Sequence, residues 1–133
     1  MEREQEIVEM LKACEPKDEM TMTEMRALNA KIPNAKSFLI EVKKRQENSV
    51  SQLRLALKRF RAEKLLALGV SKAKADPILD TDPDIQALED KYEVESLFLS
   101  WLRDVIGLLE DWSLHIRKAI TLEMEDMRGM RRE

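Results

Sequence analysis

The feature that most constrains the fold is a series of apolar residues, towards the end of the chain, that recur at alternating steps of three and four. The series comprises Ile85, Leu88, Tyr92, Leu99, Leu102, Ile106, Leu109, Ile116 and Ile120. This spacing places the apolar side chains on one face of a long α-helix, with gaps only at Glu95 and Ser113. Phe98, Val105 and Trp112 widen that face, as expected when a helix has partners on more than one side. The sequence therefore predicts an all-α fold.

Residues that start and stop helices divide the first part of the chain. Over residues 1–33 we expect two short amphipathic helices. The first should end near Cys14, because a proline follows two residues later and its predecessor avoids the helical conformation. The second can be capped by Thr21 or Thr23, and Pro33 should interrupt or kink it.

Two long helices account for most of the remaining sequence. The first is predicted over 34–69 and ends on a glycine, the residue type that best accepts the left-handed conformation after a helix. Its apolar face is interrupted at Gln46 and Ser49. The connection 70–83 is rich in aspartate and holds two prolines, so we expect a loop there. Asp82 has the features of an N-cap, with Pro83 at the first helical position, and it introduces a long amphipathic helix over 84–128.

The two long helices should pack against each other. A short connection makes sequential helices neighbours, so the sequence predicts a long antiparallel helical hairpin with coiled-coil-like packing inside one domain, 1–133. Gly107 lies in the middle of the last helix, where a glycine costs about 1 kcal/mol relative to alanine. It therefore indicates either a close helix crossing, which we favour, or a bend.

Composition narrows the class of protein. Of the 133 residues, 37% are charged and 5% aromatic, a balance typical of long helices and coiled coils. The single cysteine, Cys14, excludes an internal disulfide framework, and the N-terminus lacks the zones of a secretory signal, so we expect a cytoplasmic protein. No apolar run approaches the roughly 20 residues needed to cross a bilayer, so no membrane association is expected.

Charge is strongly segregated along the chain. Residues 43–64 hold eight basic residues against two acids, whereas 76–111 hold eleven acids and two bases. Within the basic run, four cations advance in steps of four, three and three and form a stripe along the helix; they are Arg54, Lys58, Arg61 and Lys64. The stripe could follow the phosphates of a nucleic acid. It could equally pair with the acidic helix across the hairpin, at about 0 to 1 kcal/mol per surface ion pair.

Catalytic and metal-binding patterns are missing from the sequence. The only histidine, His115, has no second imidazole or thiol at ligand spacing. Asp80, Asp82 and Asp84 match the start of a calcium-binding loop, but the glycine required at its sixth position is Ile85, and the glutamate required at its twelfth is also missing. We therefore expect a protein without enzymatic activity, metal or cofactor.

Several stretches together resemble a known family. They are the basic stretch LKRFRAEK at 57–64, the Asp-rich stretch ILDTDPDI at 78–85 and the closing EDMRG at 125–129, combined with the overall length and two short N-terminal helical segments. In these features the chain resembles the UvsY recombination mediator family of T4-like bacteriophages. The resemblance implies a non-enzymatic, ring-forming helical protein in the host cytoplasm. Such a protein binds single-stranded DNA, contacts a recombinase and a single-strand-binding protein, and helps load the former in place of the latter.

Carried onto this chain, the resemblance assigns DNA contacts to Lys58, Arg59 and Arg61, extended by Arg54 and Lys64. The sparse aromatic residues depart from what a base-stacking platform needs, so any binding should be mostly electrostatic. The alternative is a coiled-coil assembly, scaffold or adaptor protein that binds no nucleic acid and uses both charge runs only for helix pairing.

The wide apolar face of the last helix also predicts self-association. Part of that face should pack within the protomer, and the part nearer the C-terminus should hold subunits together in a homo-oligomer. The residues predicted to do so are Ile116, Ile120, Met124 and Met127.

Overall fold

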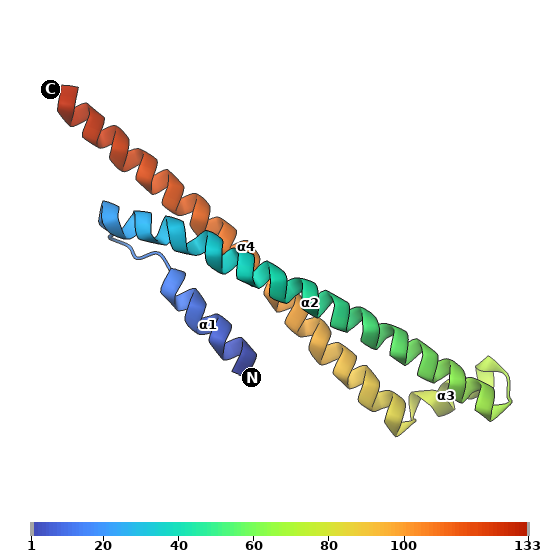
Figure 1. Ribbon diagram of the computed structural model, residues 1–133. Helices are drawn as coiled ribbons and strands as arrows, with labels where there is room; N and C mark the ends of the chain where they lie inside the picture. Colours follow the sequence, from blue (N-terminus) through green and yellow to red (C-terminus); the bar gives the residue numbers. More distant parts are fainter. Residues whose placement is uncertain (1, 133) are drawn as a thin grey trace. The chain divides into compact units, whose positions relative to one another are not determined.

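The computed structural model describes residues 2–132, with side chains described as far as residue 130. Within that range the chain forms four helices and no strand (Figure 1). The helices are α1, Glu2–Cys14; α2, Met22–Leu68; α3, Lys72–Asp80; and α4, Pro83–Arg132. The prediction of an all-α fold is confirmed.

The start of α2 is fixed by a reciprocal pair of hydrogen bonds. The backbone N–H of Glu24 donates to Oγ1 of Thr21 at 3.2 Å, and the backbone N–H of Thr21 donates to Oε1 of Glu24 at 3.1 Å. This arrangement is a capping box, and it satisfies two backbone donors at the helix start. Of the two threonines that the sequence offers as caps, Thr21 is therefore the one used.

The second predicted helix does not stop at Pro33. It continues into the predicted helix 34–69, so that α2 is one element of 47 residues with Pro33 inside it. A proline in a helix interior costs about 3 kcal/mol. Burial of Ile32 and Leu39 offsets that cost, because each fully buried large aliphatic side chain contributes about 1.5–3 kcal/mol.

The end of α2 follows the sequence prediction, but the connection after it does not. Gly69 has a φ of 63°, the left-handed conformation expected there. The predicted loop over 70–83 contains the helix α3. Ala75 and Leu79 lie one helical turn apart on α3 and are both buried. Their packing in the apolar cluster stabilises the helical conformation of this segment. The aspartates and prolines of the segment favoured the prediction of a loop, and the two apolar residues that form the buried face of α3 were too few to predict a helix.

The start of α4 confirms the predicted cap. Oδ1 of Asp82 accepts hydrogen bonds from the backbone N–H groups of Asp84, at 2.9 Å, and Ile85, at 3.2 Å. Pro83 is the first residue of α4, where its missing N–H costs nothing. At Gly107, further along α4, no described atom outside the adjoining turns of its own helix lies within 4 Å of where a Cβ would be. The favoured prediction of a close helix crossing at Gly107 is therefore wrong.

The contacts group the chain into two compact units, and α2 and α4 each contribute to both. The first unit comprises the chain up to Glu41 and from Arg103 onward. Its buried side chains include Ile32, Leu39 and Leu109, and Nζ of Lys36 lies 3.0 Å from Oε1 of Glu110.

The second unit is Val42–Leu102 and contains the end of α2, all of α3 and the start of α4. Its buried cluster of Ala75, Leu79 and Ile85 packs against Leu57, Phe60 and Leu65 of α2. Figure 1 shows α3 next to the end of α2. The predicted DNA-binding residues all lie in this unit.

Candidate nucleic-acid interface

The structure divides the five predicted DNA-binding residues into two groups. Arg54, Lys58 and Arg59 are exposed on α2. Arg61 and Lys64 are half-buried, with about a third of each side chain accessible, and both are engaged by acids. The basic residues that the sequence predicts as one DNA-binding stripe therefore lie in two different environments. The first group is exposed to solvent, and the second is paired with acids.

Arg61 lies against three carboxylates. Its Nη2 donates a hydrogen bond to Oδ1 of Asp80 at 2.7 Å and lies 3.5 Å from Oδ1 of Asp76, both on α3. Its Nη1 lies 3.8 Å from Oε1 of Glu89 on α4. The hydrogen bond to Asp80, assisted by the two aspartate charges, raises the pKa of Arg61 above its ordinary value.

Lys64 has a similar set of partners at the start of α4. Its Nζ donates to Oδ2 of Asp82 at 2.8 Å and lies 3.5 Å from Oδ2 of Asp84. The same ammonium lies 5.2 Å from the centre of the Phe60 ring, within cation–π distance. The hydrogen bond to Asp82 raises the pKa of Lys64, and the same bond, together with two backbone donors, lowers the pKa of Asp82.

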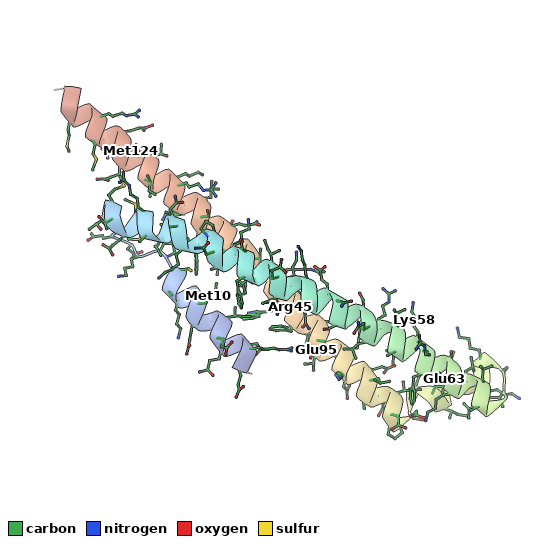
Figure 2. All side chains as sticks on the ribbon, viewed as in Figure 1. Met10, Arg45, Lys58, Glu63, Glu95 and Met124 are labelled. Carbon is green, nitrogen blue, oxygen red and sulfur yellow. The ribbon has the colours of Figure 1, made fainter. Side chains whose placement is uncertain are left out.

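The exposed group has no such neighbours. Among the described residues, none forms an ion pair with Arg54, Lys58 or Arg59. In Figure 2, Lys58 is labelled on the side of α2 that is turned away from α4. Their positive charge is therefore available to a partner outside the chain.

Arg45 is a further exposed cation of the same helix and is likewise unpaired among the described residues. It precedes Arg59 by two heptads and so lies on nearly the same face, about 21 Å away along the axis. Arg45 belongs to the basic run of residues 43–64, but the prediction of DNA-binding residues left it out. The two-heptad spacing to Arg59 was the available signal.

Within the second unit, no described aromatic side chain is exposed, so none adds a stacking platform beside these cations. The exposed Phe38 of α2 belongs to the first unit. Phe98 and Trp101 of α4 stack on each other with ring centres 5.8 Å apart, and Phe98 is buried. Phe60 faces Lys64 and the α3 cluster. Binding at the exposed cations would therefore depend on charge, as expected from the composition.

The four residues predicted to hold subunits together also differ in exposure. Ile116 is fully buried within the single chain and Ile120 is half-buried, whereas Met124 and Met127 are exposed. Ile116 therefore has no free surface to offer a second chain. The predicted interface reduces to Ile120, Met124 and Met127, and Met124 is labelled in Figure 2 on the last part of α4.

The single cysteine and the single histidine of the chain occupy a packing position and a surface position, respectively. Cys14 is completely buried, and that burial, only partly opposed by the charge of Lys31, raises the pKa of its thiol. His115 is exposed on α4. In the part of the chain that the structure describes, no three His, Cys, Asp or Glu residues are placed to hold a metal ion.

These features define the class of the molecule as an all-helical protein with a cationic helix surface. Comparisons with protein-family models, with curated proteins and with solved structures found no match. Over residues 2–132, no helix carries a stretch long and apolar enough to cross a membrane.

Proposed function

We propose that the protein is a non-enzymatic, single-stranded-DNA-binding recombination mediator that helps load a recombinase onto DNA covered by single-strand-binding protein. The observation that supports this proposal is the exposure of Arg54, Lys58 and Arg59 on α2 without an ion-pair partner among the described residues. Uncompensated cations on a rigid helix attract phosphates and displace their counterions. The proposal includes a ring-shaped homo-oligomer in the host cytoplasm, in which α2 and α4 form an antiparallel, coiled-coil-like hairpin.

The proposal predicts a defined salt dependence. Each phosphate contact with single-stranded DNA should contribute about −0.7 to the slope of log K against log salt. Contacts by Arg54, Lys58 and Arg59 should therefore give a slope of about −2 per subunit. Affinity should vary little with base sequence, because phosphate contacts carry little sequence information.

The test is fluorescence anisotropy of a labelled oligonucleotide at several salt concentrations. Wild type should bind with a dissociation constant in the micromolar range or below at low salt, and the Lys58→Ala/Arg59→Ala variant should bind more weakly with a flatter slope. Its matched control is Arg26→Ala/Lys31→Ala, which removes the same charges from exposed positions of the same helix. An unchanged affinity and slope in the first variant, or an equal loss in the control, would contradict the proposed surface.

A second candidate function is a coiled-coil assembly, scaffold or adaptor protein. The observation that favours it is the pairing of Arg61 and Lys64 with acids of α3 and α4, which leaves less charge for a partner. Under this function wild type binds no oligonucleotide at any salt concentration. The melting temperature of Lys58→Ala/Arg59→Ala should equal that of wild type in either case, because neither side chain forms an ion pair within the described chain.

A further inference from the structure

Five carboxylates, drawn from two helices and the turn between them, enclose two cations at the end of α2. Arg61 is held by Asp76 and Asp80 of α3 and by Glu89 of α4, at 3.5, 2.7 and 3.8 Å. Lys64 is held at 2.8 Å by Asp82 of the turn and at 3.5 Å by Asp84 of α4. Most of the acids in the first part of the acidic run are therefore paired with only two cations.

The five carboxylates occupy N–H donors of Arg61 and Lys64 that could otherwise bind a phosphate. A guanidinium presents a planar fork that pairs with a carboxylate or a phosphate in the same geometry. Arg61 follows the exposed Lys58 by three residues, so the two side chains are neighbours along α2. A polyanion that contacts Lys58 would therefore lie close to Arg61, whose guanidinium already donates a hydrogen bond to Asp80.

The segment that carries Asp76 and Asp80 is weakly held. The helix α3 has nine residues, contains Pro77, and follows Gly69 in its left-handed conformation. A helix shorter than about 12 residues is marginal by itself in water, so α3 depends on its contacts. Its buried anchors are Ala75 and Leu79, while the large apolar side chain of Ile78 is half exposed.

We propose that α3 is an autoinhibitory acidic clasp, in which Asp76 and Asp80 compete with nucleic-acid phosphates for Arg61. This inference rests on the proposed function and adds its regulation. With the clasp closed, only the exposed cations of α2 meet the strand. When α3 is displaced, Arg61 joins them, and the affinity and salt dependence both increase.

The test replaces the two carboxylates with amides of the same size in Asp76→Asn/Asp80→Asn. Anisotropy with labelled oligo-dT should show about tenfold tighter binding, the effect of one added charge-assisted contact, and a slope steeper by about 0.7. The control is Asp90→Asn/Glu93→Gln, which makes the same charge change at exposed positions of α4 within the same unit that have no ion pair with any described residue. Adding Arg61→Ala to the first variant should abolish the gain.

The outcomes separate the clasp from the proposed function. If wild type binds and Asp76→Asn/Asp80→Asn is no tighter than the control, the clasp is wrong and the DNA-binding surface stands. If neither wild type nor the variant binds, both proposals fail. Binding by the variant alone would support the clasp in its strongest form, since wild type would then be fully inhibited.

Amide hydrogen exchange gives a second measurement that does not depend on affinity. In wild type, adding oligo-dT should speed exchange across residues 72–80, because displacement of α3 exposes its backbone. The start of α2, at residues 22–30, serves as the internal reference and should not change. Slower exchange in 72–80 on adding the oligonucleotide would overturn the clasp, because it would mean that the strand holds α3 in place.

Discussion

Gln46 is buried in the second unit, at a polar break in the apolar face of α2. Its amide nitrogen donates to the backbone oxygen of Glu95 at 2.9 Å and to Oε2 of the same residue at 2.6 Å. Leaving a buried amide unpaired costs about 1–3 kcal/mol, so any shifted alignment of these helix segments would carry that penalty. A single polar pair in an apolar seam can fix register in this way.

The sequence revealed each of these breaks but not their pairing. Gln46 interrupts the apolar face of α2 and Glu95 interrupts that of α4, and both gaps are visible in the apolar spacing. Which gap meets which depends on the alignment of the two helices, and a single helix's periodicity carries no information about it. Ser113, the other gap in α4, instead accepts a hydrogen bond from Nη2 of Arg117 at 2.9 Å within its own helix.

Asp82 provides a prediction on pH. Its pKa is lowered by the hydrogen bond from Lys64 and by the backbone donors of Ile85 and Asp84. A lowered folded-state pKa means that the ionised carboxylate contributes stability above the unfolded pKa of about 3.9, and that this stability is lost as the pH falls through the folded pKa. Asp82→Asn keeps a good N-cap but removes the charge. Its melting temperature should lie below that of wild type at pH 7, and the difference in melting temperature should shrink and be lost as the pH falls through the folded-state pKa of Asp82.

The control for this prediction is Asp90→Asn, at an exposed position of α4 that forms no ion pair within residues 2–130. The difference in melting temperature between Asp90→Asn and wild type should stay nearly constant over the same pH range. Thermal unfolding followed by circular dichroism measures both variants. A difference for Asp82→Asn that persisted into acid would mean that the charge of Asp82 does not contribute to folding.

At the scale of elements, the signals at helix ends and the apolar periodicity of α4 were reliable, whereas prolines and aspartates were poor guides to where helices break. The cap at Asp82 and the stop at Gly69 depend on a few adjacent residues and were predicted, and the cap of α2 was narrowed to Thr21 or Thr23. The path of α2 through Pro33 and the existence of α3 depend on side chains buried by distant segments. Local sequence preferences are overridden at such places, and the two acids of α3 that neutralise Arg61 could not be located without that helix.

Gly107 gives the prediction for an element. Because a Cβ added there would meet no described atom beyond the adjoining turns of its own helix, Gly107→Ala should raise the free energy of unfolding by about 1 kcal/mol. Urea unfolding measures the change. Gly129→Ala, equally free of neighbours but near the end of α4, should change it much less, because helix ends fray. Destabilisation by Gly107→Ala would indicate that a second chain packs closely at this glycine.

At the scale of the whole molecule, the end of α4 carries an apolar face that the described part of the chain covers only in part. Ile120, Met124 and Met127 follow the buried Ile116 by four, eight and eleven residues, so they continue its face of the helix. The exposed fraction rises from zero at Ile116 to 40% at Met124 and 45% at Met127. A face that is buried along one part of a helix and uncovered along the next is suited to a second copy of the chain.

We therefore predict that wild type self-associates through this part of α4. Light scattering should give a mass that is a multiple of 15.5 kDa. Met127→Glu should shift the mass towards that of the single chain with little loss of helix content, because a charge cannot enter an apolar interface without a partner. The control is Leu66→Glu, which places the same charge at an exposed apolar position of α2 and should leave the mass unchanged. A wild-type monomer across micromolar concentrations would exclude self-association, and dissociation by Leu66→Glu alone would move the interface from α4 to α2.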